Sequence, residues 1–357
     1  MTDKKDSKEK ESWKDSLNIA DEIARLGGAE GLGDFDFKRF FGGIYKDHSE
    51  EEVEQSLIVG TSTTTPSINE VSIEYPQPWL FFRLITGSII LFYSFVAVYN
   101  QFENANLLPG IIFTGSFAVP ISTLFLFFEL NIRRNVPIWQ VMRLVLTGGL
   151  LSLFVALVLF QNAFAFLGPQ GAWIAGLLEE PAKLIALVVL VKDNKKYPYI
   201  LNGLLLGAAV GCGFAAFESA GYALRFGITD IDALVKVTQL RGVLSPFAHI
   251  VWTAIAGAAL WRVQRGGEFY YRLLLKKEFY APFGTVVFCH AIWNSGSSIP
   301  FMGKFIICGL IAWTVALSLL NLGIKQIADE KAGKNIFKRF QASTNSENTF
   351  QPKTLEY

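Results

Sequence analysis

The stretch Gly176–Leu190 reads GLLEEPAKLIALVVL and places two adjacent glutamates and a lysine inside an otherwise apolar segment. A charged side chain near the centre of a membrane helix costs at least about 2.5–3.5 kcal/mol. The segment nevertheless carries three ionisable residues between Glu179 and Lys183. Such residues usually face the interior of a helix bundle, pair with one another and mark functional sites. This stretch therefore predicts a buried polar site inside a membrane protein.

Composition supports an all-α, polytopic membrane protein. The chain has 357 residues, of which 51% are hydrophobic and 31 are phenylalanine, and a soluble protein of this length would be more polar. The net charge of +1 indicates no nucleic-acid partner. All three cysteines lie in apolar segments, which excludes a disulfide framework. The N-terminal MTDKKDSKEKES has no apolar core, so we expect no cleavable signal peptide.

Eight apolar segments follow Trp79, each close to the 20 or so residues that cross a bilayer. Their approximate limits are 79–99, 108–130, 141–161, 169–191, 199–224, 241–263, 280–298 and 303–325. The sequence thus predicts a cytoplasmic arm over residues 1–76, partly disordered, a transmembrane domain over 77–326 and a polar cytoplasmic tail over 327–357. Within the arm, Ser49 and Glu52 form a capping-box pattern that predicts a short helix. We expect the single histidine of the arm, His48, to be exposed.

The charges of the connectors predict the orientation. Basic residues gather in the second, fourth and sixth connectors: Arg133, Arg134 and Arg143; Lys192, Lys195 and Lys196; Arg262, Arg265, Arg272, Lys276 and Lys277. The fifth connector is mixed, because Asp230 and Asp232 offset Arg225, Lys236 and Arg241. By the positive-inside rule the even-numbered connectors and both termini are cytoplasmic. We expect an integral protein of a bacterial cytoplasmic membrane.

With this orientation, ionisable residues of four spans lie at one depth. These residues are Glu179 and Glu180 in the fourth span, Glu218 in the fifth, His249 in the sixth and His290 in the seventh. At 1.5 Å per residue they lie roughly 10–17 Å below the outer surface. Two of the three histidines of the chain belong to this layer. We expect these side chains to meet in the outer half of the membrane.

Local spacing adds further residues to this layer. Lys183 lies three and four residues after the glutamate pair, so it can pair with either carboxylate. His290 and Asn294 are four residues apart, so their side chains can point toward the same bound group. A glutamate pair beside one lysine can hold one ionised and one protonated carboxyl near neutral pH. An ionised carboxylate can take a proton from water, while an imidazole and a carboxamide can stabilise an oxyanion. The inventory suits peptide-bond hydrolysis by activated water.

These motifs resemble those of PrsW-type intramembrane proteases. Glu179-Glu180-Pro-Ala-Lys183 is similar to the family's EExxK motif, and Phe214-Ala-Ala-Phe-Glu218 is similar to its FxxxE motif. His249 and His290 match the histidines of the next two spans. A more distant likeness is to CAAX prenyl proteases, whose HxxxN motif matches His290–Asn294, whereas their EExxxR and FxxxH motifs do not match this sequence. Prenyl-protein processing is therefore the less favoured activity.

The resemblance covers about residues 79–325 and implies endoproteolysis of a membrane-anchored protein, such as a transmembrane anti-sigma factor, at its extracytoplasmic side. It implies that one of Glu179 and Glu180 is the base, tuned by its neighbour and by Lys183. Glu218 and His249 would orient the water or protonate the leaving amine. His290 and Asn294 would stabilise the oxyanion.

Three alternatives stay open on the sequence alone. We expect no cofactor, yet Glu218, His249 and His290 are residue types that bind zinc, which would make the protein a zinc-dependent protease. A proton- or cation-coupled transporter would also use intramembrane glutamates and histidines. A non-catalytic scaffold would leave the polar layer unexplained. The substrate, the oligomeric state and the choice between the two adjacent glutamates are not indicated.

Overall fold

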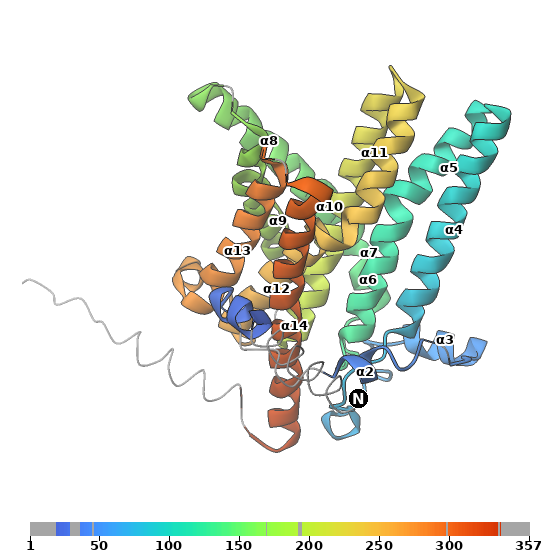
Figure 1. Ribbon diagram of the computed structural model, residues 1–357. Helices are drawn as coiled ribbons and strands as arrows, with labels where there is room; N and C mark the ends of the chain where they lie inside the picture. The colour runs from blue at the N-terminus through green and yellow to red at the C-terminus, as the bar shows by residue number, and fades with distance from the viewer. Residues whose placement is uncertain are drawn as a thin grey trace, which may run out of the picture.

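Helices form all the regular secondary structure in the part of the chain that the computed structural model describes (Figure 1). That part comprises residues 19–28, 36–44, 46–168, 170–191, 195–297, 299–334 and 336. The expected N-terminal segment MTDKKDSKEKES, Lys192 of the fourth connector and most of the expected C-terminal tail lie outside it. The all-helical prediction is confirmed for the described residues.

Six helical segments are long and apolar enough to cross a membrane. Their bounds are Trp79–Phe102, Ala105–Leu130, Ile138–Leu167, Ile200–Gly227, Ile231–Gln264 and Pro300–Lys331. Within them lie α4 (Trp79–Phe102), α5 (Leu108–Phe113), α6 (Val119–Leu130), α7 (Ile138–Arg143), α8 (Gly149–Leu167), α10 (Ile200–Gly227), α11 (Ile231–Leu244), α12 (His249–Gln264) and α14 (Gly303–Lys331). Short π-helical turns over Thr114–Ala118 and Leu144–Gly148 join α5 to α6 and α7 to α8.

The other two predicted spans are helical but shorter. They correspond to α9 (Ala175–Leu190), with 16 residues, and α13 (Lys277–Asn294), with 18. At 1.5 Å per residue these helices are roughly 24 and 27 Å long. Both carry polar residues of the predicted layer.

The fifth connector differs from the prediction. Residues that the sequence analysis assigned to this connector form α11, which begins at Ile231, just after the N-cap residue Asp230. A short 3₁₀ turn at Ser245–Phe247, containing Pro246, ends α11 and lets the chain restart as α12 at His249. The polar side chains of α11 did not prevent helix formation, and one of them, Arg241, has a buried partner described below.

Helix α10 is the centre of the bundle (Figure 1), with contacts to α6, α8, α9, α11, α12 and α14. Its glycines lie directly against the α12 backbone: a Cβ at Gly203 would lie 2.6 Å from the carbonyl oxygen of Gly257. Gly207 and Gly211 likewise face the carbonyl oxygens of Thr253 and His249. Small residues at this spacing let two membrane helices approach closely. This contact fixes the start of α12 beside the middle of α10.

Residues of the N-terminal arm cover one end of the bundle, where α2 (Phe37–Phe40) and α3 (Glu50–Leu57) lie (Figure 1). The capping box of Ser49 and Glu52 is confirmed at the start of α3. The expectation that His48 is exposed is wrong, because its ring stacks on Trp79 with centroids 3.8 Å apart and its side chain is 15% exposed. Aromatic packing against the first membrane helix accounts for its burial.

Basic side chains of the membrane helices and of the connector between α6 and α7 donate hydrogen bonds to the backbone of this arm. Arg262 donates to the carbonyl of Gly28 (2.8 Å), Arg83 to Lys46 (3.0 Å), Arg134 to Gln55 (2.5 Å), Arg133 to Pro66 and Lys331 to Val71 (2.8 Å). A guanidinium or ammonium group supplies several donors and no acceptor, so each can satisfy a loop carbonyl. The arm is thereby attached to the bundle at several separate points.

Candidate active site

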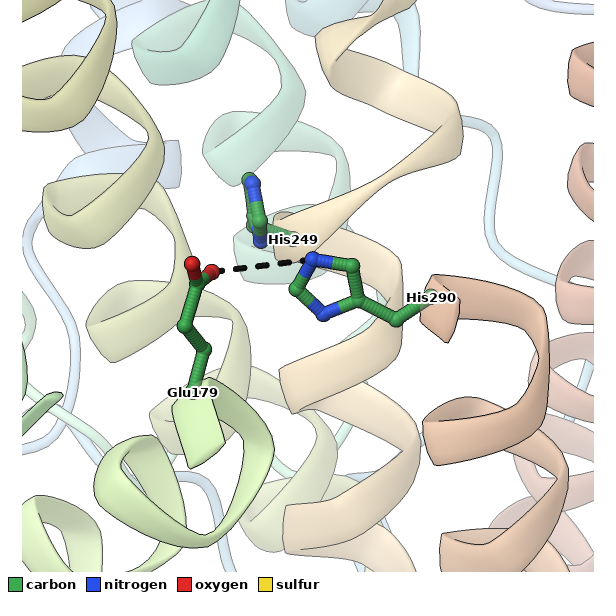
Figure 2. A group of neighbouring side chains, drawn as sticks. All are labelled: Glu179, His249 and His290. Atoms are coloured by element: carbon green, nitrogen blue, oxygen red, sulfur yellow. Dashed lines mark ion pairs between the residues drawn. The ribbon is translucent and has the colours of Figure 1, made fainter. Parts of the chain in front are cut away.

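Six of the seven residues singled out from the sequence meet in one buried cluster. Glu179, Glu180 and Lys183 come from α9, Glu218 from α10, His249 from α12 and His290 from α13. Figure 2 shows Glu179, His249 and His290 pointing toward one another from three helices. The seventh residue, Asn294, is partly buried one turn beyond His290 at the end of α13. No hydrogen bond of the Asn294 side chain occurs among the described residues.

The most buried part of the cluster is centred on Glu180. Its Oε1 atom lies 2.5 Å from Lys183 Nζ and 2.6 Å from His290 Nδ1, and the Glu180 and Lys183 side chains are fully buried. The ammonium group of Lys183 also lies 4.8 Å from the ring centroid of Phe214 and 5.9 Å from that of Trp252. A lysine over aromatic rings gains cation–π attraction in addition to its ion pair. The Phe of the FxxxE motif thus contributes directly to the site.

Lys183 connects this part to the second half of the cluster. Its Nζ lies 3.0 Å from His249 Nδ1, and His249 Nε2 lies 3.0 Å from Glu218 Oε2. A protonated lysine has donors only, so Nδ1 accepts from it and Nε2 carries the proton donated to Glu218. On the other side, His290 Nδ1 donates to the Glu180 carboxylate, which leaves the lone pair on Nε2. The contacts therefore fix opposite tautomers for the two histidines.

A residue that the sequence analysis left out of the site completes the cluster. Arg241 of α11 forms an ion pair with Glu218 Oε2, and its Nε donates to Ser219 Oγ at 2.9 Å. In the sequence, Arg241 resembles a connector charge because it follows Asp230, Asp232 and Lys236. An arginine at the edge of an apolar span, at the depth of unpaired glutamates, is a signal that could have identified it.

Together these contacts link acidic and basic side chains in one continuous series. Its order is Arg241, Glu218, His249, Lys183, Glu180, His290 and Glu179. The last link is looser, because His290 Nε2 lies 3.6 Å from Glu179 Oε2 (Figure 2). Glu179 Oε2 is buried and has no hydrogen-bond partner, whereas the Glu179 side chain retains 9% exposure. The Glu179 end of this series of contacts therefore has a free proton acceptor, the Oε2 atom, near an accessible edge of the cluster.

The cluster also contains a set of possible metal ligands. One ligand atom each of Glu179, His249 and His290 lie within 4.8 Å of one another. Carboxylate and imidazole are ordinary zinc ligands, and the bond from His290 Nδ1 to a carboxylate is the usual way in which a ligating histidine is oriented. The set contains Glu179 where the sequence suggested Glu218, because Arg241 and His249 already bind Glu218. The residues present fit a divalent cation in type and proximity.

Comparisons with known proteins agree with this geometry. The model of the family described as PrsW family intramembrane metalloprotease matches residues 136–320, just over half of the chain. The matched region includes all seven residues proposed from the sequence and also Arg241.

The chain is also similar to Protease PrsW from Shouchella clausii (strain KSM-K16), with 26% identity over 131 residues. That match covers 36% of this chain and 58% of the relative, so the chain spans less than two thirds of the length of the relative. No solved structure matches the chain. Because the family model matches more than half of its length, this integral membrane protein belongs to the PrsW family.

Proposed function

We propose that this protein is an endopeptidase that hydrolyses a peptide bond of a membrane-anchored protein within or near the bilayer. The observation that carries the proposal is the pair formed by Glu179 Oε2 and His290 Nε2. This pair ends the series of contacts that begins at Arg241. Two proton acceptors facing each other can hold and deprotonate a water molecule. Membership of the PrsW family, described as intramembrane metalloproteases, and the likeness to a protein named Protease PrsW support peptide-bond hydrolysis.

In the proposed reaction, Glu179 rather than Glu180 is the base. Glu180 is committed to Lys183 and His290 and has no exposed surface. Glu179 takes a proton from water while the water oxygen attacks the carbonyl carbon of the substrate. The Asn294 carboxamide is the donor that we assign to the developing oxyanion, because the His290 proton is used at Glu180.

The second half of the cluster then serves the leaving group. As the C–N bond breaks, the amine nitrogen takes a proton, and His249 is the donor that we assign to this step. Its proton on Nε2 is held by Glu218, and its orientation is fixed by Lys183 on the opposite nitrogen. As His249 loses its Nε2 proton, Lys183 gives a proton to Nδ1 of the same ring. The proton that Glu179 gained from water then replaces the one that Lys183 lost, which returns the site to its starting state.

A divalent cation is the alternative way to activate the water. Glu179, His249 and His290 would hold it, and a bound zinc ion would acidify water and polarise the substrate carbonyl. To bind the cation, His249 would have to give up its contact with either Glu218 or Lys183, because each of its ring nitrogens has a partner.

We also propose that α9 and α13 cross the membrane, which gives eight spans with both termini in the cytoplasm of a bacterial cell. The basic residues that bind the arm, such as Arg133 and Arg262, lie beside it through hydrogen bonds to its carbonyl groups. The positive-inside rule then makes the end of the bundle that the arm covers cytoplasmic. The cluster would lie in the outer half of the bilayer, where an anti-sigma-factor-like substrate would be cut.

Tight packing between α10 and α12 argues against a transporter. An ion path from the cluster along α10 and α12 would meet Gly207 and Gly203, where the two backbones are in direct contact. A transport path needs polar or water-filled space through this region. Hydrolysis within one layer does not.

The proposal is tested with a panel of single-span membrane proteins in proteoliposomes. Wild type, His290→Ala and the matched control Gly221→Ala are each assayed with and without a chelator. Gly221 lies on α10 with no other residue within 4 Å of a Cβ at that position, so the control should not disturb packing. We expect wild type and Gly221→Ala to cut at least one substrate, and His290→Ala to cut none.

The chelator separates the two forms of water activation. Unchanged cleavage supports Glu179 as the base, and loss of cleavage that zinc restores assigns Glu179, His249 and His290 to a cation. Equal cleavage by His290→Ala and wild type would overturn the assignment of this cluster.

A further inference from the structure

Arg241 lies at the open edge of the cluster, on a helix that the family motifs do not include. Its guanidinium binds Glu218, its Nε donates to Ser219 Oγ at 2.9 Å, and its Cζ lies 4.5 Å from the ring centroid of Tyr222. All three partners belong to one turn of α10. An arginine fork held by a carboxylate, a hydroxyl and an aromatic face has one preferred position.

The oxygen that Arg241 binds is the one that holds His249. Glu218 Oε2 is the acceptor for both the Arg241 guanidinium and His249 Nε2, the latter at 3.0 Å. A carboxylate on a flexible glutamate side chain has several rotamers, and an arginine on the far side restricts them. The placement of the His249 ring therefore depends on Arg241 through a single shared atom.

Helix α11 is itself fixed closely enough to hold that arginine in place. Thr238 and Gly242, three residues before and one after Arg241, pack against Gly115 of the π-helical turn before α6. A Cβ at Gly242 would lie 2.9 Å from the Gly115 carbonyl oxygen, so the two backbones touch. The Arg241 side chain remains 24% exposed and Glu218 16% exposed, which leaves this end of the cluster near its surface.

We propose that Arg241 is a positioning residue that sets the geometry of His249 through Glu218. This inference rests on the proposed function, because its consequence is the rate of the protonation step assigned to His249. The polar contacts of Arg241 are with Glu218 and Ser219, and they do not include the Glu179–His290 pair or Lys183. Its removal should therefore slow the reaction without changing the binding of substrate.

The first test is kinetic and uses the full chain in proteoliposomes. Arg241→Gln should lower kcat by about 10- to 100-fold, as is typical for the loss of a supporting contact to a functional histidine, with KM unchanged. Arg241→Lys should recover part of the rate. Lys236→Gln, which removes one exposed positive charge from the same helix, is the matched control and should behave as wild type.

A double-mutant cycle separates positioning from a general structural role. If Arg241 acts only through Glu218, then Arg241→Gln adds no further loss to Glu218→Gln. Additive losses, an increase in KM alone or a wild-type rate for Arg241→Gln would each overturn the proposal. The double variant contains no unpaired Glu218 charge, so it serves if the single variant is unstable.

The second test does not depend on cleavage. The chain has three histidines, so ¹⁵N-histidine labelling gives few ring signals, and His249→Gln assigns one pair of them. Arg241→Gln should shift the His249 ring nitrogens and leave those of His48 unchanged. Unshifted His249 signals overturn the positioning role, whereas shifted signals in a protein that cuts no substrate would refute the proposed function alone.

Discussion

Glu179 and Glu180 are neighbours in the sequence but have different surroundings in the structure. Successive residues of a helix point about 100° apart, so one glutamate faces Lys183 and the other faces the free side of His290. Glu180 is fully buried and its Oε1 atom meets both Lys183 and His290, whereas the contact of Glu179 with His290 Nε2 is longer, at 3.6 Å. The sequence could predict that a glutamate pair meets two histidines. It could not assign the roles, because these depend on which histidine nitrogen each carboxylate meets.

Lys183 should be essential for stability, because it is a fully buried cation between Glu180 and His249. Lys183→Met leaves the buried Glu180 carboxylate without its cation, and we expect the free energy of unfolding to fall by about 3–5 kcal/mol. Reversible unfolding in mixed detergent measures it. The double variant Lys183→Met/Glu180→Gln should be the more stable of the two. A single variant as stable as wild type would show that the ion pair does not contribute.

The role of Arg241 in the cluster could not be predicted from the sequence pattern. Near two aspartates and a lysine it has the appearance of a connector charge. Its assignment to the cluster requires knowing that α11 lies against α10, a contact set by Thr238, Gly242 and Gly115. His48 was misjudged for a similar reason, since its stacking partner Trp79 belongs to the first membrane helix.

At the scale of elements, hydropathy predicts the long apolar helices well. Each helix must by itself be long and apolar enough to cross the bilayer. The five helices that supply the cluster, α9 to α13, include the two predicted spans that are shorter than the six long segments, α9 and α13. These two helices carry Glu179, Glu180, Lys183 and His290 of the cluster. Gly203, Gly207 and Gly211, spaced four residues apart on α10, permit its close contact with α12.

Glycine substitutions on α10 test this contact. Gly207→Ala places a methyl group against the Thr253 carbonyl and should destabilise the bundle by about 1–3 kcal/mol, as overpacking does. Gly221→Ala, on the same helix with open space around it, should be neutral or slightly stabilising because alanine is the better helix former. The comparison is made by unfolding in mixed detergent. Equal stabilities for the two variants would argue against backbone contact between α10 and α12.

At the scale of the molecule, one end of the bundle differs from the other. The end that carries the arm has the basic side chains that donate to loop carbonyls, including Arg83, Arg134 and Lys331. The positive-inside rule predicts which connectors share a side, and it depends only on counting charges. The attachment of the arm could not be predicted in this way, because each contact joins residues far apart in the sequence.

Sidedness can be measured by cysteine labelling in oriented vesicles. A cysteine is placed at the exposed Ser62 of the arm or at the exposed Asn106 between α4 and α5, with Cys212, Cys289 and Cys308 replaced by alanine. An impermeant maleimide added from the cytoplasmic side should label position 62 and not position 106. Labelling of position 106 from that side, or of both positions from one side, would contradict the proposed orientation.

The most direct measurement for the whole account compares the cleavage rate of Glu179→Gln with that of wild type on one substrate that wild type cuts. Glutamine keeps the size of the side chain and removes its ability to take a proton from water. We predict a rate loss of about 100- to 10,000-fold, with an unchanged unfolding midpoint, since Glu179 Oε2 has no hydrogen bond to lose. A Glu179→Gln variant that cuts at the wild-type rate would show that hydrolysis does not occur at this cluster.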